Sequence, residues 1–486
     1  MTEEPRFAEL LRLLGEVDDL RKAGWLLQWD LQTMMPRSGA EVRAEQLGTL
    51  AGIAHQRFTA DELGVLLEDL RGFEDDLDYD SDEASVIRVT RRDYERARRV
   101  PADLSSELVR VGALGHQAWL RARDENDYTV FRPALERNLE LQGRYIECLD
   151  GGADPYDVLV AEYEPGLTTA DVAAVFEPLR DELAPLVAEL EPPDSAPLDL
   201  GFSSEERRAA VDALLSRLGF AREWGRVDVS VHPFMINFGT GDVRLTVYEE
   251  GDLRTLYAAL HEFGHGLYER GVDPALERTT LALGASGALH ESQSLLWENL
   301  VGRSREFCGW LAGLLAGVEP EALYRGANRI ERSLIRVDAD PVTYSLHIVF
   351  RFELERELVS GALAAADLRD AWNARVASYL GLPAPDDLNG VLQDMHWSDT
   401  LMGYFPSYAL GHIASAQIWE RARADLPELD EQIGRGDFGQ LTEWLREHVH
   451  RHGRKFTTPE TMERAVGGTF DAGPLLSFVR SKLEAS

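Results

Sequence analysis

Two histidines stand four residues apart in the segment LHEFGHGLYERG, which runs from Leu260 to Gly271. On an α-helix this spacing puts both residues on one face, about 6 Å apart at their β-carbons, so His261 and His265 can direct two imidazoles at one cation. A catalytic zinc site has three protein ligands, an open position for water, and a carboxylate that takes a proton from that water. Glu262 directly follows His261 and can supply the carboxylate. The segment therefore predicts two metal ligands and a base.

The third ligand must come from elsewhere, and the next predicted helix is GASGALHESQSLLWENLVG, residues 284–302. It offers His290, Glu291 and Glu298. Glu291 lies 26 residues after His265, which is enough chain to leave one helix, turn and return a carboxylate from the next. Spacing alone leaves the ligand role open between Glu291 and Glu298, and each could instead be a surface acid.

The elements that must position these residues are expected to be helices. Apolar residues recur at helical spacing through most of the chain, as in residues 172–183, so the fold is predicted to be mostly α. A proline-rich break, ELEPPDSAPLDLGF, separates a helical part of about residues 1–190 from a part of about 203–486 that holds the candidate metal site. Ser203 and Glu206 form a predicted capping box at the start of that second part.

The candidate metal helix is expected to begin near Asp252, which can cap it, and to end at Gly271, which can adopt the left-handed conformation. Two segments with alternating apolar residues, GRVDVSVHPF and GTGDVRLTVYEE, precede it around a glycine-rich turn. This alternation predicts a small β-sheet or hairpin beside the helix.

Acidic residues outnumber basic ones by 85 to 50, a net charge of −35. So negative a surface repels phosphate backbones and anionic membranes, so we expect no nucleic-acid partner and no membrane partner. Nearly all the positive charge is arginine, because Lys22, Lys455 and Lys482 are the only lysines. This composition fits a GC-rich genome or an acidic proteome adapted to salt, and we favour a salt-rich cytoplasm.

The N-terminus does not predict export, and the most apolar run does not predict membrane insertion. The first twenty residues are charged throughout and lack the apolar stretch of a signal peptide, and the apolar run 307–318 is too short to cross a bilayer. We therefore expect a cytoplasmic protein. In a reducing compartment Cys148 and Cys308 are expected to be buried thiols.

Two charged segments invite functional readings that their patterns do not support. The acidic run 74–83 has alternating aspartates, but Ser81 and Ile87 stand where a calcium loop needs glycine and a bidentate glutamate, so a solvated loop is expected. Residues 91–99 interleave acids with arginines, which predicts a salt-bridged helix.

The histidines of REHVHRHGRKF, two residues apart, do not share a helix face and are expected at a helix end.

The chain resembles the carboxypeptidase Taq family of metallocarboxypeptidases over essentially its whole length. The resemblance rests on a set of segments in the family's order: WDLQTMMPRSGAEVRAEQL (29–47), HPF (232–234), DVRLT (242–246), HEFGH (261–265), HESQ (290–293), IRVDAD (335–340) and GVLQDMHW (390–397). H-E-x-x-H alone is shared by many metallopeptidases, but the ordered set is highly specific.

The resemblance implies a single catalytic domain over residues 1–486, mostly helical, with a long substrate groove. It implies a homodimeric enzyme that removes single C-terminal residues from peptides with broad specificity, using Zn²⁺, for which Co²⁺ can substitute. In the family the acid of the H-E-S-Q segment completes the metal site, which assigns the third ligand to Glu291. Glu298 then becomes a supporting acid.

The remaining roles follow from this chemistry and the matched segments. Glu262 is expected to deprotonate the attacking water. A free C-terminal carboxylate calls for an arginine, and the resemblance makes Arg336 the first choice and Arg244 the second, although each could serve only as a structural partner of a neighbouring aspartate. The residues expected to stabilise the oxyanion or contact substrate are, unranked, His232, His396, Tyr404 and Tyr408.

Two positions depart from the family's pattern beside matched segments, namely Pro341 and His412, and they put substrate preference in doubt more than the reaction. The alternative function is a metalloendopeptidase or aminopeptidase, which would use the same zinc helix without a carboxylate-binding arginine. A non-catalytic helical scaffold would not need the water-activating acid.

Overall fold

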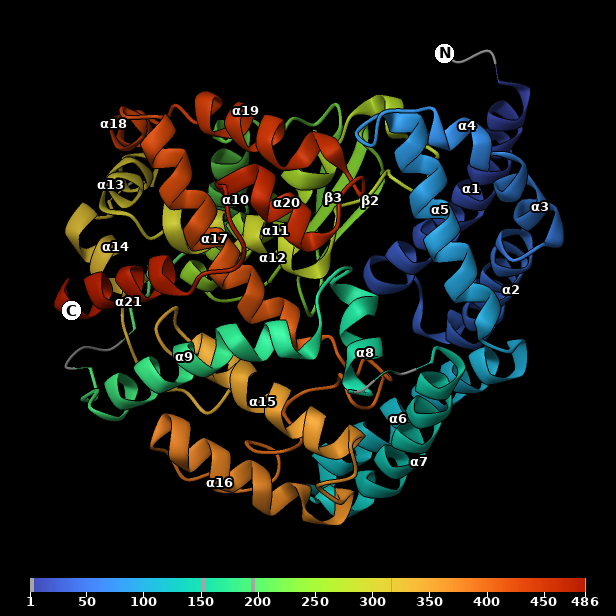
Figure 1. Ribbon diagram of the computed structural model, residues 1–486. Helices are drawn as coiled ribbons and strands as arrows, with labels where there is room; N and C mark the ends of the chain where they lie inside the picture. Colours follow the sequence, from blue (N-terminus) through green and yellow to red (C-terminus); the bar gives the residue numbers. More distant parts are fainter. Residues whose placement is uncertain (1–3, 151, 153, 194–196, 316, 486) are drawn as a thin grey trace.

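The computed structural model describes residues 4–150, 152, 154–193, 197–315 and 317–485. Helices dominate it, which confirms the predicted class (Figure 1). The helices before the sheet are α1 (Pro5–Thr33), α2 (Ala40–Phe58), α3 (Asp61–Asp69), α4 (Arg71–Asp75), α5 (Asp82–Arg99), α6 (Ala102–Glu125), α7 (Tyr128–Cys148), α8 (Tyr156–Tyr163), α9 (Thr169–Ala188) and α10 (Ser204–Arg217).

The helices after the sheet are α11 (Asp252–Gly271), α12 (Gly287–Leu295), α13 (Arg305–Leu314), α14 (Pro320–Ala327), α15 (Tyr344–Val359), α16 (Leu368–Leu380), α17 (Phe405–Asp425), α18 (Leu429–Arg435), α19 (Gly439–His448), α20 (Thr458–Val466) and α21 (Gly473–Ala485). A π-helix, Leu296–Val301, continues α12 directly. Short 3₁₀ turns lie at Arg37–Gly39, Pro274–Leu276, Arg336–Asp338, Ala365–Asp367 and His450–His452.

The predicted small sheet has three strands, β1 (Gly225–Val229), β2 (Met235–Gly239) and β3 (Asp242–Val247), in the order β1-β3-β2. Strands β2 and β3 form the expected hairpin, whereas β1 runs parallel to β3 on its other edge. The connecting residues wrap around the end of β3, where the Thr246 hydroxyl accepts a hydrogen bond from the Phe234 amide at 2.8 Å. Strand alternation predicts strands but not their partners, so the parallel pair was not foreseen.

Helix α11 has the predicted bounds, but both capping arguments were wrong. Gly251, at φ 84°, is the N-cap, and the Asp252 carboxylate instead accepts hydrogen bonds from the Phe202 amide and Arg207 near the start of α10. Gly271 is not among the residues with positive φ. Glycine is required there because a β-carbon would lie 2.6 Å from the β-carbon of His450.

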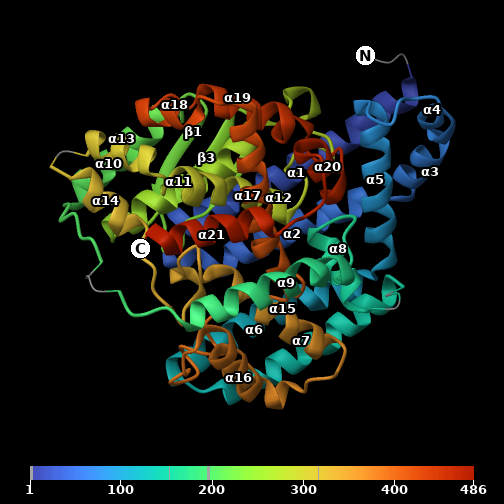
Figure 2. The same ribbon diagram turned by 60° about the vertical axis from the view of Figure 1, so that its left-hand side comes forward.

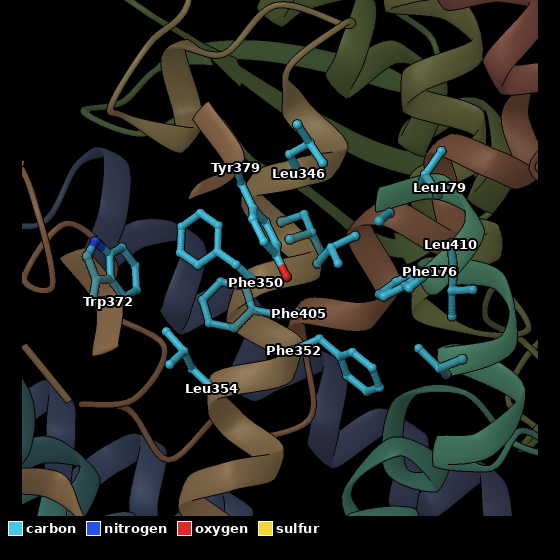
Figure 3. Packing of buried hydrophobic residues seen from close by; sticks show 14 of the residues in the cluster. Phe176, Leu179, Leu346, Phe350, Phe352, Leu354, Trp372, Tyr379, Phe405 and Leu410 are labelled. Atoms are coloured by element: carbon cyan, nitrogen blue, oxygen red, sulfur yellow. The ribbon is translucent and has the colours of Figure 1, made fainter. Parts of the chain in front are cut away.

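The sheet and α11 lie in one half of the molecule, and α15 and α16 lie in the other (Figures 1 and 2). A hydrophobic cluster around α11 includes Leu256, Phe263 and Leu245 of β3. A second cluster surrounds α15, where Phe350 and Phe352 pack against rings of α16 and α9 (Figure 3). Because α12 and α17 contribute to both clusters, the two halves share the helices that carry the site.

Several local expectations are confirmed. Ser203 and Glu206 form the capping box of α10. Residues 91–99 lie in α5, where Arg91 pairs with Glu74 and Arg96 with Glu162. Cys308 is buried, whereas Cys148 is only partly so. Among the described helices, none is long and apolar enough to cross a membrane.

Candidate metal centre

The close approach of α11 and α12 brings the two predicted metal segments together. A β-carbon on Gly264 would lie 2.4 Å from the carbonyl oxygen of Gln293, so the glycine between the histidines allows the α12 backbone to touch α11. Helix α17 closes the other side, where a β-carbon on Gly411 would lie 2.7 Å from that of Glu291. Backbone contact at these two glycines fixes how the ligand-bearing helices meet.

His261, His265 and Glu291 converge there, each offering one ligand atom, with all three atoms within 4.8 Å of one another. The His261 Nε2 lies 3.8 Å from one carboxylate oxygen of Glu291, and the His265 Nε2 lies 3.6 Å from the other. Donors about 2 Å from a tetrahedral zinc are ~3.3 Å apart, so small movements would seat one ion. Across the described part of the chain, no other group of histidines, cysteines and acids has this geometry.

The charges at this site favour a cation. Burial acts to lower the pKa of His261, but the carboxylates of Glu291 and Glu298 outweigh it and raise that pKa to about 10. Burial, assisted by Glu291, raises the pKa of Glu262 to about 7. A buried cluster in which an imidazole must take up a proton to offset its acids is one that a divalent ion would stabilise.

Glu262 is 6 % exposed and lies beside the ligands on α11. Among the described residues, no donor forms a hydrogen bond to its carboxylate, although the charges of His261, Glu291 and Glu298 all act on its pKa. A carboxylate without a protein partner at a metal site is free to accept a proton from water.

Glu298 lies outside this group of possible ligands and contacts one of them from behind. Its Oε2 lies 2.9 Å from the Nδ1 of His261, on the side of the ring away from the cluster, and Arg303 donates to its Oε1 at 3.1 Å. The π-helix Leu296–Val301 carries Glu298. The wider π turn presents Glu298 one residue out of α-helical register, and such turns frequently mark functional sites.

A second charged cluster lies near the first and is built from arginines. Arg336 Nε donates to Asp394 Oδ1 at 2.8 Å, and the fully buried Arg351 donates to the other carboxylate oxygen at 2.7 Å. Against the cost of burial, these two guanidinium groups hold the pKa of Asp394 well below its usual range. Two buried cations sharing one carboxylate leave an excess of one positive charge.

His396, Tyr404 and Tyr408 lie with this arginine cluster. The His396 Nε2 is 3.2 Å from the Tyr408 hydroxyl, and its ring stacks on Tyr404 at 5.8 Å. Arg336 lies over the Tyr408 ring, 4.9 Å from its centroid. Burial, with the Arg336 charge, lowers the pKa of His396 to about 3, so the imidazole is neutral at physiological pH.

The two clusters are neighbours. Burial raises the pKa of Tyr408 to about 12, and the charges of both Arg336 and Glu291 act on that pKa. The charge of Arg336 also acts to lower the pKa of Glu291, although burial raises it overall. The possible metal ligands and the arginine cluster are therefore close enough for their charges to act on each other.

The contacts of Arg244 and His232 are with residues outside the metal cluster. Arg244, on β3, donates from two nitrogens to both carboxylate oxygens of Asp242 at 2.8 Å and packs over Phe238. His232 is exposed, and within the described residues no hydrogen bond or ion pair joins either side chain to the metal cluster. The ion pair with Asp242 is the one that the structural alternative for Arg244 names, and its role in carboxylate binding stays a prediction.

The sequence missed two buried charges at the site. Glu269, on α11, contacts His290, and Arg351, on α15, holds Asp394. Glu269 had a usable signal, since it stands four residues after His265 on the same helix face. Arg351 had a weaker one, a lone arginine in the apolar run SLHIVFRFEL. Of the departures from the family pattern, His412 is buried, with Nδ1 3.0 Å from the Ser345 hydroxyl.

Comparison with known proteins agrees with this geometry. The model of the carboxypeptidase Taq (M32) metallopeptidase family matches residues 9–483. Thermostable carboxypeptidase 1 of Thermus thermophilus is 37% identical over 100% of this chain and 99% of its own, and carboxypeptidase 1 of Bacillus subtilis is 34% identical over 99% and 98%.

Solved structures agree as closely. The M32 carboxypeptidase of Deinococcus radiodurans R1 superposes with a TM-score of 0.94 at 40% identity, and the Pyrococcus furiosus carboxypeptidase with 0.95 at 33%, each covering 99% of both chains. By sequence and by fold, the chain belongs to the carboxypeptidase Taq (M32) family of metallopeptidases.

Proposed function

We propose that this protein removes single C-terminal residues from peptides, with broad specificity, as a zinc enzyme in which Co²⁺ can substitute. The observation that carries the proposal is the pairing of a three-ligand cation site with the positive excess at Arg336. An endopeptidase or aminopeptidase needs the first cluster only. A carboxypeptidase needs both, because its substrate always ends in a free carboxylate.

His261, His265 and Glu291 would hold the ion, and two imidazoles with one carboxylate suit zinc and cobalt. When bound, the ion would lower the pKa of a coordinated water and polarise the scissile carbonyl. Glu262, beside these ligands, would accept a proton from the attacking water and pass it to the leaving amine. The three ligands stay fixed throughout, since each is supported by packing or hydrogen bonds behind it.

Arg336 would bind the substrate's C-terminal carboxylate, with Asp394 and Arg351 fixing its position. Tyr408 and the neutral His396 supply uncharged donors beside it, which suits stabilisation of a developing oxyanion without trapping an ion pair. Tyr404, stacked on His396, orients that ring. Arg244 and His232 are the weaker candidates for substrate contact.

A peptide with a blocked N-terminus and a free C-terminus tests the proposal. Mass spectrometry should show stepwise loss of single C-terminal residues with zinc or cobalt and none with a chelator. The same peptide with a C-terminal amide should resist. Internal cleavage would establish an endopeptidase, and inertness until the N-terminus is freed would establish an aminopeptidase.

We further propose a cytoplasmic homodimer. The dimer rests on the family resemblance, and Val42 on α2 and Val109 on α6, which are 64% and 75% exposed, are chosen as sites to test it. Sedimentation velocity should give twice the chain mass. Val42→Glu and Val109→Glu should shift the species toward monomer, and a wild-type monomer at micromolar concentration would refute the dimer.

A further inference from the structure

The two histidine ligands are supported from behind in different ways. The Nδ1 of His261 meets a carboxylate directly, at 2.9 Å from Glu298. The Nδ1 of His265 instead meets another imidazole, at 2.6 Å from the Nδ1 of His290. The far nitrogen of His290, Nε2, lies 3.0 Å from Oε1 of Glu269. His265 is therefore connected to a carboxylate, that of Glu269, only through the ring of His290.

The hydrogen bonds behind His265 have one consistent set of donors and acceptors. If the Nε2 of His265 faces the cation, its Nδ1 must carry the hydrogen and donate to the Nδ1 of His290. His290 then carries its hydrogen on Nε2 and donates to Glu269. Glu269 can only accept, which agrees with the hydrogen bond that its Oε1 receives from the Gly284 amide at 3.0 Å.

This series of hydrogen bonds continues from Glu269 to the N-terminal helix α1, and along it each donor points toward Glu269 or toward the Asn237 oxygen. Asn237 of β2 donates from Nδ2 to Oε2 of Glu269 at 2.6 Å. Lys22 of α1 donates to the side-chain oxygen of Asn237 at 3.0 Å. An ammonium has no acceptor, so it fixes the orientation of the Asn237 amide, and that amide fixes which carboxylate oxygen is left for His290.

Packing holds the intervening ring in place. The His290 ring lies within 28° of the plane of His265, with ring centroids 4.6 Å apart, and within 28° of the plane of Tyr268, at 5.5 Å. A β-carbon on Gly284 would lie 2.8 Å from His290, so that position must be glycine for the ring to fit. Glu269 is 3 % exposed, and its charge would be costly to bury without these donors.

We infer that Glu269 is a positioning residue for the metal ligand His265, acting through His290, and that Asn237 and Lys22 set the polarity of this relay. The inference rests on the proposed metal site. A direct carboxylate makes an imidazole a stronger donor than a neutral ring does, so His261 and His265 are unequal ligands. The relay fixes the tautomer and angle of the weaker one.

Glu269→Gln is the sharpest test, because an amide cannot satisfy the same donors. Its oxygen can serve His290 and Gly284, but its NH₂ group then meets the NH₂ group of Asn237, which Lys22 prevents from turning. The cobalt dissociation constant, measured by competition with a chelator, should rise about 10- to 100-fold. The visible absorption bands of the cobalt-saturated variant should also shift.

His290→Phe is the second variant, since it keeps a stacking ring and removes both nitrogens. It should weaken cobalt binding to the same degree. The matched control is Glu355→Gln, because Glu355 is also a buried carboxylate with three donors, from Tyr156, Trp397 and the Gly403 amide, but it has no route to a histidine ligand. It should leave cobalt affinity within about 3-fold of wild type.

The outcomes separate the relay from the site itself. Loss of thermal stability in Glu269→Gln with unchanged cobalt affinity and spectrum would reduce Glu269 to a structural acid and overturn the inference. Wild-type cobalt affinity in His265→Ala would instead overturn the proposed metal site. Weaker binding in His265→Ala, Glu269→Gln and His290→Phe, but not in Glu355→Gln, supports both.

Discussion

The two charged clusters of the site differ in how their buried charges are balanced. At the metal cluster, the Nε2 atoms of His261 and His265 face the Glu291 carboxylate, and each Nδ1 is hydrogen-bonded on the far side of its ring. At the arginine cluster, Arg336 and Arg351 are already paired with Asp394. The first cluster gathers possible metal ligands, whereas the second balances its buried charges internally except for one surplus positive charge. Replacing a metal ligand should therefore abolish metal binding, and replacing a residue of the arginine cluster should reduce activity by degrees.

The largest expected effect is at Glu262. Glu262→Gln keeps the ligands and removes the base, so kcat should fall by about 10²- to 10⁴-fold, while bound metal, measured by atomic emission, stays near wild type. Because Glu262 acts on the attacking water and not on the substrate's C-terminal carboxylate, KM should change little. Substantial retained activity would contradict the role of Glu262.

The next effect separates the two acids around His261. Glu291→Gln should abolish stoichiometric metal binding, because it removes a ligand. Glu298→Gln should keep the metal and bind it more weakly, by about 10- to 100-fold, because it removes only the support behind one ring. Isothermal titration of the apoproteins measures both. The reverse ranking would make Glu298 the ligand.

A graded effect is expected at the arginine cluster. Arg336→Met should lower kcat/KM for peptides with a free C-terminus by about 30-fold or more, chiefly through KM, because it removes a charge-assisted contact worth ~2 kcal/mol or more. Arg336→Lys should lose less. Arg244→Met is the control, and kinetics on one peptide series ranks all three. A larger loss at Arg244 would exchange the two assignments.

A further effect, on stability and not on activity, concerns a third kind of buried acid, one held by uncharged donors. Glu164 accepts hydrogen bonds from the Ala288 amide at the start of α12 and from the hydroxyls of Ser407 and Thr458. Burial raises its pKa to about 7, whereas the arginines lower that of Asp394. Glu164 therefore contributes stability below pH 4.5 that is lost as pH rises through 7, by an amount of about 3 kcal/mol.

Denaturant unfolding of the apoprotein at pH 5 and pH 7.5 measures that loss. Glu164→Gln should remove the part that Glu164 supplies and leave the part due to Glu355, whose pKa burial also raises to about 7. An unchanged pH dependence in the variant would show that Glu164 ionises normally. Asp394→Asn should act in the opposite direction, because Asp394 contributes stability that is lost only as pH falls.

The sequence predicted what depends on local pattern. The bounds of α11 were predicted correctly, although from capping arguments that were wrong, and the approach of His261 to His265 follows from their spacing along one helix. The choice between Glu291 and Glu298 needed more, because it depends on a π turn that no helical periodicity reveals. Resemblance, rather than spacing, selected Glu291.

Residues whose partners are distant in the sequence were missed or misjudged. Glu269 and Arg351 carried sequence signals that were not used, and their partners in β2 and in the segment after α16 appear only in the fold. Arg244 pairs with Asp242, two residues away on the same face of β3, and its role as the second candidate for carboxylate binding stays a prediction. The sharing of Asp394 by Arg336 and Arg351 could not be predicted from the sequence, because the three residues are brought together only by the fold.

The π turn at Leu296–Val301 also makes the site sensitive to chain length. A π turn holds one residue more than an α turn, so loss of a single codon between Glu291 and Glu298 would let the segment relax into a regular helix. Each residue contributes about 100° of rotation, and the Glu298 carboxylate would swing away from His261 without any change in amino-acid type. A substitution along this stretch changes one side chain and leaves the others in place, whereas a deletion would separate Glu298 from His261 in one step.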